Sequence, residues 1–414
     1  MPTANVTLDE ILAARDARAA TQMRLLSRYQ RPLISFTLNI AGPVKQTPLT
    51  DFAFDAGLSR LREALGEPVV QEVIRPHTGC EARLVYDRPA AELKALCLAL
   101  ESKSPIGRLY DLDVLDIDGE KLSRPTPRTC LICGAPVTAC SRSRAHGLDA
   151  IIAKTNDILA DFAAEHLAEM AESALLAEVE LTPKPGLVDQ RNNGAHDDMD
   201  LPLFRRSATA LRPTFRAMVL AGMEVASAAE LQTLGLQGEQ AMFAATGGVN
   251  THKGALYSFS LLLAAIGSCL VRGGDIFETA TAFAAQLLSP GDTHGASVKH
   301  RYQVGGVRAE ALAGFSTARR AAAMLTEHDP LTVLLWLLVN TQDSNLYYRG
   351  GAEGAAFVRQ TAAQILSQPL EQRTALLEAM DDAMIARHLS PGGCADLLAL
   401  ALFLQSLSPY HIGA

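Results

Sequence analysis

The chain has 414 residues, of which 48% are hydrophobic and 20% charged, and its formal net charge is −8 at pH 7. This length and composition predict two or three folded domains and exclude an intrinsically disordered protein. The first 158 residues carry 20 basic and 19 acidic side chains, and the remainder carries 17 and 26. Because no basic face stands out, nucleic acid is not an expected partner.

Neither a signal peptide nor a membrane span is expected from the sequence. Its first 22 residues lack the apolar core of a signal peptide. The most apolar stretch, residues 256–270, is shorter than a bilayer span and is interrupted by Ser260, Gly267 and Ser268. We therefore expect a cytoplasmic protein that does not bind membranes. Its seven cysteines are an odd number, so reduced thiols or metal ligands are expected rather than disulfides.

Helix and strand patterns alternate along the first 130 residues. The predicted elements are helices over 8–29, 52–65 and 90–101 and strands over 33–40, 82–87 and 109–117. This mixture predicts an α+β domain.

The rest of the chain reads as helical. After a cysteine-bearing segment, a long helix is predicted over 148–179. From there to the end, Ala- and Leu-rich helices alternate with loops rich in Gly, Pro, Asn and Asp. We predict a first domain over 1–155 and a larger all-α domain over 160–414.

The strand predicted over 109–117 carries a candidate metal site. Positions i and i+2 of a strand share a face, so Asp111 and Asp113 point to one side, with Arg108 just before them. Two such carboxylates can hold Mg²⁺, which bridges phosphates and stabilises a departing pyrophosphate. The alternative is an edge strand with a solvated acidic face, since Asp116 and Asp118 continue the run. Residues 39–45 and 78–79 are turn segments that could lie beside the same site.

A cysteine motif follows. Cys130, Cys133, Cys140 and His146 have the spacing C-x2-C-x6-C-x5-H, and the first pair is typical of a zinc knuckle. Four ligands so close in sequence can form a tetrahedral structural zinc site. The alternative is a set of reduced cysteines packed in a helical hairpin.

Four segments of this first region resemble a known family. SFTLNIAGPVK, TGCEARLVYD, PIGRLYDLDVLDIDGEKLSR and CLICGAPVTACSRSRAH resemble the apo-citrate lyase phosphoribosyl-dephospho-CoA transferases, over about residues 10–150. The resemblance implies transfer of a phosphoribosyl-dephospho-CoA group to a serine of the citrate lyase acyl carrier subunit, with release of pyrophosphate. This is nucleotidyltransferase-type activity, and it gives Asp111 and Asp113 a role as catalytic Mg²⁺ ligands beside Arg108.

The second region contains five polar islands between apolar helices. They lie at residues 184–198, 247–254, 292–302, 343–351 and 390–396. A Gly-Gly pair can simply end a helix, and Asp, Ser or Asn can simply begin one. Five islands of similar chemistry nevertheless favour loops gathered around one pocket for a phosphorylated ligand.

Within that pocket we predict cations and carboxylates in separate roles. Lys184, Lys253 and Arg349 are the candidate phosphate ligands, supported by Gly247, Gly248, Asn250 and His252 of the sequence GGVNTHKG. This run lacks the spacing of a Walker A motif. The candidate metal ligands or bases are Asp189, Asp197, Asp198, Asp343 and Asp396.

These islands resemble the triphosphoribosyl-dephospho-CoA synthases, over about residues 165–410. LTPKPGLVD, ATGGVNTHKGA, RGG and LSPGG-x-ADLLA are among the segments that carry the resemblance. It implies that ATP and 3′-dephospho-CoA react to give 2′-(5″-triphosphoribosyl)-3′-dephospho-CoA and adenine. Tyr348 replaces a histidine of the family pattern, Cys394 a serine and Ala309 a glycine. If the chain is active, neither Tyr348 nor Cys394 is an essential acid or nucleophile.

The implied reaction converts a β-nucleoside into an α-linked product, which fits a single inverting displacement. Such a site needs a base for the incoming hydroxyl, a donor to the adenine ring and cations for the triphosphate. Asp197 or Asp198 is the predicted base or metal ligand. His196, His252 and His294 are the candidate donors.

Three alternatives remain. One is the equivalent prosthetic-group pathway of malonate decarboxylase, against which the first region argues. Another is an N-ribosyl hydrolase that releases adenine without dephospho-CoA. The third is an assembly factor that grips the acyl carrier subunit through the basic residues Arg142 and Arg144, which leaves the polar islands unexplained.

Overall fold

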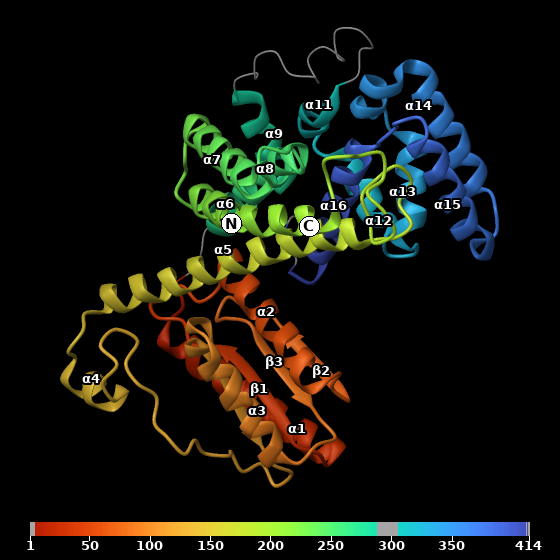
Figure 1. Ribbon diagram of the computed structural model, residues 1–414. Coiled ribbons are helices and arrows are strands. Elements are labelled where there is room, and N and C mark those ends of the chain that lie inside the picture. Colours follow the sequence, from red (N-terminus) through yellow and green to blue (C-terminus); the bar gives the residue numbers. More distant parts are fainter. Residues whose placement is uncertain (1–4, 288–304, 411, 413–414) are drawn as a thin grey trace. The chain divides into compact units, whose positions relative to one another are not determined.

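The computed structural model describes residues 5–287, 305–410 and 412. The chain divides into two compact units, Met1–Ala163 and Ala164–Ala414, which we call unit 1 and unit 2. The division falls inside the 33-residue helix α5 (Leu148–Glu180) (Figure 1).

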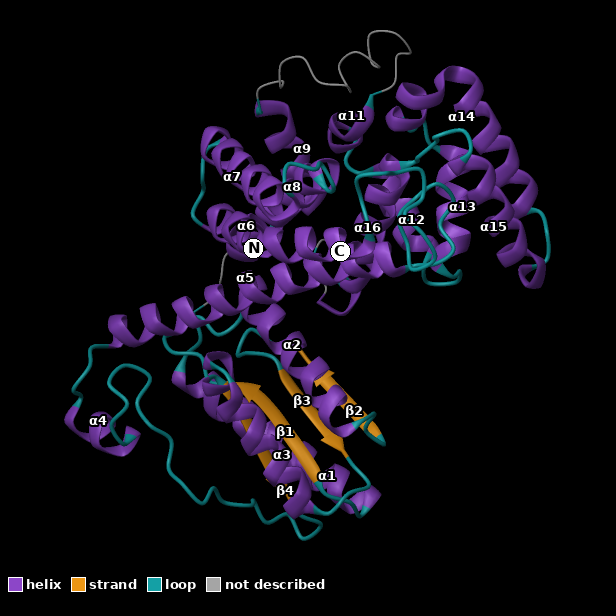
Figure 2. Cartoon of the chain, in the orientation of Figure 1, coloured by secondary structure: helices purple, strands orange, loops and turns teal. Residues whose placement is uncertain are grey.

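Unit 1 is built on one antiparallel sheet with the strand order β2-β3-β1-β4 (Figure 2). The strands are β1 (Leu33–Leu38), β2 (Val70–Ile74), β3 (Glu81–Val85) and β4 (Tyr110–Leu115). The strand β4 is therefore at an edge of the sheet, next to β1.

Successive side chains of each strand point to opposite faces of the sheet, and helices cover both faces. On one face Phe36 stacks on Phe54 of α2 (Pro48–Leu65), with ring centroids 4.8 Å apart. Gly57 makes this close approach possible, since a Cβ there would lie 2.5 Å from the Phe36 ring. On the other face Leu33 packs against Leu25 and Leu26 of α1 (Leu8–Tyr29).

The third helix of unit 1 and the segment after the sheet complete it. The helix α3 (Ala90–Lys103) packs beside β4 and is followed by the short 3₁₀ helix Pro105–Arg108. Residues 121–150 contain the seven-residue helix α4 (Val137–Ser143), and none of them is buried.

Unit 2 is helical throughout its described residues. After α5 its helices are α6 (Leu201–Met223), α7 (Ala228–Thr246), α8 (Lys253–Arg272), α9 (Ile276–Gln286), α11 (Gly306–Leu312), α12 (Ser316–Met324), α13 (Pro330–Asn340), α14 (Ser344–Leu366), α15 (Leu370–Ile385), α16 (Gly392–Ser406) and the 3₁₀ helix Ser408–Tyr410.

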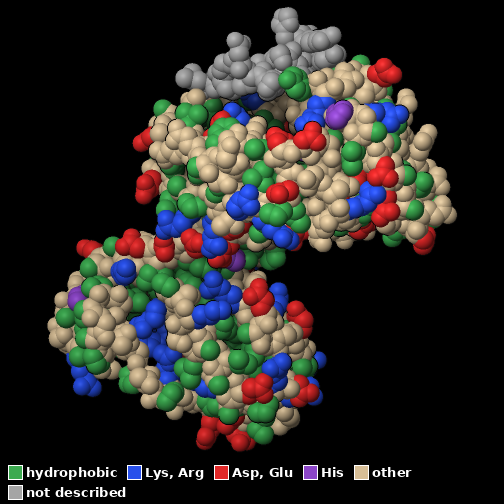
Figure 3. All heavy atoms as spheres, in the orientation of Figure 1, with side chains coloured by type: hydrophobic (Ala, Val, Ile, Leu, Met, Phe, Trp, Pro, Cys, Tyr) green, Lys and Arg blue, Asp and Glu red, His purple; other side chains and the backbone are tan. Residues whose placement is uncertain are grey.

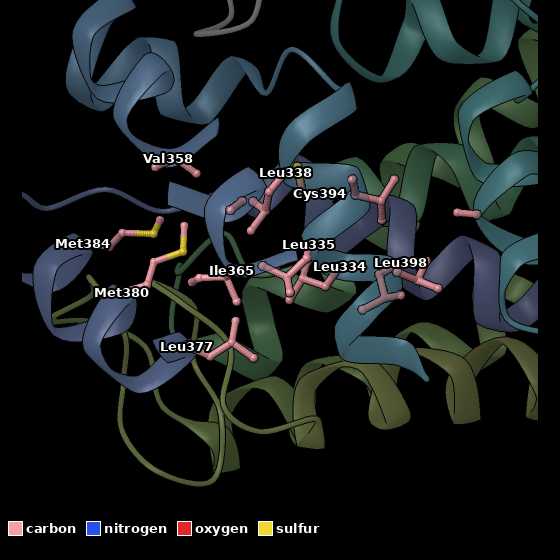
Figure 4. Close-up of a cluster of buried hydrophobic side chains, with 14 of the residues drawn as sticks. Leu334, Leu335, Leu338, Val358, Ile365, Leu377, Met380, Met384, Cys394 and Leu398 are labelled. Atoms are coloured by element: carbon pink, nitrogen blue, oxygen red, sulfur yellow. The ribbon is translucent and has the colours of Figure 1, made fainter. Parts of the chain in front are cut away.

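Among the described helices of this bundle, two apolar contacts stand out. One is a cluster of buried side chains from α13, α14, α15 and α16, among them Leu335, Val358 and Met384 (Figure 4). The other joins α6 to α8, where a Cβ at Gly222 or Gly267 would lie within 2.1 Å of a carbonyl oxygen of the facing helix. The two glycines therefore let the backbones of α6 and α8 touch.

Within the described part of the chain, two helices are long and apolar enough to cross a membrane by length and composition, Lys253–Arg272 and Gly392–Tyr410. The protein itself buries 78% of the first apolar window and 39% of the second. The first is therefore the core helix α8 of unit 2. Core helices of this kind pass the same test, so the finding is weak support for a membrane span.

The prediction of an α+β region followed by a helical region is confirmed. The strand β2 and the helix α4 were not predicted. A nucleotidyltransferase-type activity for unit 1, and the domain limits 1–155 and 160–414, stay predictions.

Candidate functional sites

The carboxylates of β4 lie together on one face, as the strand period requires. Asp111 pairs in register with Thr37 and Asp113 with Ser35 of β1. The Asp111 side chain is 44% exposed and the Asp113 side chain 27%. Each gives one oxygen to a neighbouring cation, Asp111 to Arg128 at 3.3 Å and Asp113 to Lys121 at 2.5 Å.

A buried carboxylate fixes the arginine next to Asp111. Glu101 of α3 is 4% exposed and accepts hydrogen bonds from the backbone N–H of Leu112 at 3.0 Å and from Arg128 at 2.7 Å. It also pairs with Arg124. Arg128 donates in addition to the carbonyl oxygens of Arg108 and Tyr110. Glu101 and Arg128 were not predicted as site residues, because helix periodicity and a Pro-rich loop carry no sign of this contact.

The turn segments named beside this site do meet. Lys45, Thr78, Gly79 and Cys80 line one small pocket at the end of β1, together with Leu38 and Thr50. The Lys45 ammonium donates to the carbonyl of Ile40 at 2.5 Å, and burial lowers its pKa. Leu38 pairs with Tyr110, so the pocket adjoins the strand pair that carries Asp111.

The cysteine motif converges to one point. The ligand atoms of Cys130, Cys133, Cys140 and His146 all lie within 4.8 Å of one another. The Cys133 and Cys140 sulfurs are 3.4 Å apart, and His146 Nε2 is 3.3 Å from Cys133 Sγ. Backbone N–H groups of Cys133 and Ile132 lower the pKa of the Cys130 thiol.

In unit 2 residues 184–189 of the first polar island are buried, and the carboxylate of Asp189 holds this part of the loop. Lys184 is 1% exposed, and its ammonium donates to Glu178 of α5 at 2.6 Å. Burial raises the pKa of Glu178, and the Lys184 charge opposes this. Asp189 accepts backbone N–H groups of Lys184, Arg191 and Asn192.

A second carboxylate, Asp381 of α15, anchors the same loop from a distant part of the chain. It has no exposed surface and accepts hydrogen bonds from Gly186 N at 2.8 Å and from Arg191 and Asn192 at 2.7 Å each. Glu178 and Asp381 were not predicted as site residues. The available sequence signal for Glu178 and for Asp381 was a charged residue among apolar residues of a helix.

His196 is held in one tautomer. Arg349 can only donate, so its hydrogen bond of 3.2 Å makes His196 Nδ1 an acceptor. Nε2 then carries the proton and donates to Ser390 Oγ at 2.9 Å. Burial and the Arg349 charge lower the pKa of His196, whereas the nearby charges of Asp198 and Asp197 raise it. Asp197 and Asp198 are themselves exposed.

His252 is the second histidine of the site and is almost completely buried. Its Nδ1 lies 2.8 Å from Ser207 Oγ, which in turn contacts Thr251. Its Nε2 has no hydrogen-bond partner among the described residues. Burial and the Lys184 charge lower the pKa of His252 to about 3, so the ring is neutral at pH 7.

The remainder of GGVNTHKG forms the turn between α7 and α8. Gly247 ends α7 in the left-handed conformation with φ 66°, and Gly248 follows at φ 91°. The Asn250 side chain accepts from the backbone N–H of Lys253 at 3.3 Å. The Lys253 ammonium pairs with Glu239 at 2.5 Å and is 45% exposed.

The fourth and fifth islands meet at the start of α14 and α16. Asp343 accepts backbone N–H groups of Asn345, Leu346 and Cys394. Burial raises the pKa of Asp343, and that of Asp396 is raised by burial and by the charges of Glu178 and Asp343. A Cβ at Gly254 would lie 2.1 Å from an Asp396 oxygen, so Asp396 touches the start of α8.

Cys394 and Tyr348, two of the positions that depart from the family pattern, differ in their exposure. Cys394 is 1% exposed, lies 3.1 Å from Thr341 Oγ1, and has a pKa raised by burial. Tyr348 is 55% exposed.

Four of the five islands therefore adjoin one another. The third, including His294, lies outside the described residues. On the face shown in Figure 3, acidic and basic side chains are interspersed over both units.

Comparison with known proteins assigns both units. The model of the ATP:dephospho-CoA triphosphoribosyl transferase family matches residues 164–412. The model of the apo-citrate lyase phosphoribosyl-dephospho-CoA transferase family matches residues 6–162. Together these matches define a bifunctional transferase.

Curated relatives agree with this assignment. Protein CitXG of Haemophilus influenzae is 38% identical, over 97% of this chain and 96% of that protein. The 2-(5''-triphosphoribosyl)-3'-dephosphocoenzyme-A synthases of Haemophilus ducreyi and Pectobacterium atrosepticum are 36% and 41% identical, over 67% and 56% of this chain and 99% and 85% of those proteins. The chain belongs to the ATP:dephospho-CoA triphosphoribosyl transferase family, with an apo-citrate lyase phosphoribosyl-dephospho-CoA transferase domain in front.

Proposed function

We propose that the chain makes and attaches the citrate lyase prosthetic group in two consecutive transfers. Unit 2 converts ATP and 3′-dephospho-CoA into 2′-(5″-triphosphoribosyl)-3′-dephospho-CoA and adenine. Unit 1 moves the phosphoribosyl-dephospho-CoA group to a serine of the apo acyl carrier subunit and releases pyrophosphate. The observation that carries the proposal is the pair of family matches, which meet at residues 162 and 164 and leave almost no residue unassigned.

In unit 2 the proposed site lies where the buried loop after α5 meets the first turn of α8. The neutral ring of His252 has an unpartnered, buried Nε2, which suits a hydrogen bond to a ring nitrogen of the departing adenine. The exposed carboxylates Asp197 and Asp198 are the proposed bases for the incoming 2′-hydroxyl. They lie close enough to influence the charge of His196.

The triphosphate of ATP is proposed to bind Lys253 and Arg349, which both reach the protein surface. Lys184 is enclosed and paired with Glu178, so we propose that it holds the loop in place and does not bind the phosphates itself. Both oxygens of Asp189 and both oxygens of Asp343 accept backbone N–H groups, so this contact does not separate the two. The charge of Asp343 helps to raise the pKa of Asp396, which makes Asp343 and Asp396 the proposed Mg²⁺ ligands of unit 2. A divalent cation would relieve the mutual repulsion of these two buried carboxylates.

In unit 1 the proposed metal ligands are Asp111 and Asp113, with Mg²⁺ supplying charge neutralisation for the pyrophosphate leaving group. The two carboxylates share a face and keep exposed surface, as a site for a metal–phosphate complex requires. Arg108 and Arg128 are the adjoining cations. Zinc on Cys130, Cys133, Cys140 and His146 completes the proposal, because three thiols and one imidazole form a donor set typical of structural zinc.

The test is mass spectrometry on the purified chain with ATP, Mg²⁺ and dephospho-CoA, with and without the apo acyl carrier subunit of citrate lyase. We expect free adenine and a triphosphoribosyl adduct of dephospho-CoA, and then a phosphoribosyl-dephospho-CoA mass shift on the carrier serine. Adenine released equally well without dephospho-CoA contradicts the proposal and indicates an N-ribosyl hydrolase. Modification of a malonate decarboxylase carrier in preference to the citrate lyase carrier indicates the parallel pathway.

A further inference from the structure

Residues 129–146, which we call the cysteine lobe, lack a hydrophobic core. None of them is buried, and Ile132 and Val137 expose 38% and 40% of their surface. Small folded segments without a core are usually held by disulfides or by a metal ion. The lobe's cysteines are free thiols, which leaves the metal.

The four possible ligands already stand at tetrahedral spacing. A tetrahedral zinc site with Zn–S bonds of about 2.3 Å has ligand–ligand edges of about 3.8 Å. The Cys133–Cys140 and Cys133–His146 distances are 3.4 and 3.3 Å, and all four ligand atoms lie within 4.8 Å. A small increase in these ligand–ligand distances makes room for a zinc ion.

The backbone of the lobe is shaped as a knuckle around the first two cysteines. Cys130 N donates to Ala135 O at 2.7 Å and Gly134 N to Cys130 O at 3.1 Å. The N–H of Ile132 points to Cys130 Sγ at 3.4 Å, where it stabilises a thiolate. Gly134 has φ 73°, a conformation that other residues adopt at a cost.

The lobe is attached directly to the proposed site of unit 1. Arg108, which precedes β4, donates to the Thr129 hydroxyl at 2.8 Å and also to its carbonyl. Arg128, which directly precedes Thr129, donates to Asp111 and to the carbonyl oxygen of Arg108. The position of both guanidinium groups therefore depends on the chain at 128–130, where the first cysteine ligand stands.

We propose that zinc bound by Cys130, Cys133, Cys140 and His146 positions Arg108 and Arg128 beside Asp111, as the pair that binds the triphosphate of the precursor during transfer. The Arg128 side chain is paired with Glu101, and the carbonyl oxygen of Arg128 accepts a hydrogen bond from the N–H of Val137 in the lobe at 3.1 Å. Zinc is thus a positioning element, remote from the reacting atoms. The transfer readout rests on the function proposed for unit 1, whereas the metal readout does not.

The test uses the full-length chain and a Cys133→Ser/Cys140→Ser variant, with Cys269→Ser as the matched control, because Cys269 lies in α8 beside Thr279. Elemental analysis should give about one zinc per chain in the wild type and control and none in the variant. Transfer to the carrier should fall about 10- to 100-fold in the variant. Adenine release by unit 2 should stay unchanged, which controls for folding.

A merely structural role is separated from positioning by kinetics. Loss of zinc and the change Arg128→Met should each raise the KM for the triphosphoribosyl precursor and leave the KM for the carrier unchanged. If zinc acts through Arg128, removing zinc from the Arg128→Met variant should cost little more, because the two changes remove one interaction. Additive losses would overturn the positioning role.

The metal assignment has its own opposing outcomes. Cys133 is exposed, yet a thiol reagent should label it only after zinc is removed by a chelator. Rapid labelling of the chain as purified, with no uptake of added zinc, overturns the proposal. A chain that binds zinc but performs no transfer contradicts the function proposed for unit 1, and the thiol result still decides the metal site.

Discussion

In unit 1 the carboxylates Asp111 and Asp113 stand on an edge strand with side chains 44% and 27% exposed, whereas in unit 2 Lys184 and Glu178 form an ion pair with almost no exposed surface. Charged side chains therefore have different roles in the two units. A half-exposed carboxylate keeps water and metal ions within reach, and its pairing contributes little to stability. A buried charge must be paired, and breaking the pair is costly.

The same difference in burial separates two neighbouring carboxylates of α15 that contact the loop at 182–200. Asp381 is enclosed and takes three donors, while its neighbour Asp382 is 67% exposed and takes one from the same Arg191. These two neighbouring residues of α15 look alike in the sequence, yet burial decides which of their contacts hold the fold.

The largest expected effect is the loss of Asp381. Asp381→Ala leaves Gly186 N, Arg191 and Asn192 without their buried acceptor. We expect the free energy of unfolding of unit 2 to fall by about 3–5 kcal/mol. The matched change Asp382→Ala should cost less than about 1 kcal/mol. Chemical denaturation followed by circular dichroism measures both, and equal losses would contradict the role assigned to burial.

The exposed carboxylates should show the opposite profile. Asp111→Asn should lower carrier modification by about 10²–10³-fold, the usual loss when one electrostatic partner of the transition state is removed. Adenine release should be unaffected, and so should the free energy of unfolding, within about 1 kcal/mol. Asp118→Asn, at an exposed position of the same acidic run, is the control. A comparable loss in the control would favour a merely solvated acidic face.

An intermediate effect is expected from pH. His252 has a pKa lowered to about 3 by burial, so below pH 6.5 the unfolded chain binds a proton that folded unit 2 excludes. The stability due to this group is complete above pH 6.5 and is lost as the pH falls toward 3, by at most about 1.4 kcal/mol per pH unit. His252→Asn should flatten the pH dependence of unfolding between pH 4 and 6. An unchanged slope would mean that the ring is already accessible to protons.

The smallest effect on stability should come from Lys253. Its pair with Glu239 is partly exposed, so Lys253→Gln should change the free energy of unfolding by less than about 1 kcal/mol. If Lys253 binds the triphosphate, the KM for ATP in adenine release should rise about tenfold, as expected for one charge-assisted hydrogen bond. Glu239→Gln frees the lysine and serves as the control. An unchanged KM would remove Lys253 from the site.

The sequence by itself determined the elements and the motif spacing. Short strand-like runs located β1 and β3, alternating aspartates located β4, and the apolar pattern located α1 and the long helix α5. The spacing of Cys130, Cys133 and Cys140 predicted a convergence that the structure places within ligand distance. These features are local, so the residues that produce them are neighbours in the chain. The strand β2 escaped prediction because it is five residues long, lies at an edge and is only partly buried.

The partners of the functional side chains were decided only by the tertiary structure. Gly186 and Asp381 are 195 residues apart, and His196 and Ser390 are 194 apart. No periodicity joins such pairs, since each contact depends on how distant helices pack. Burial is equally non-local: the sequence named Lys184 as a phosphate ligand, and only the packed helices around it enclosed its ammonium with Glu178. Residue type thus indicated the chemistry, and packing assigned each charged group to the site or to the fold.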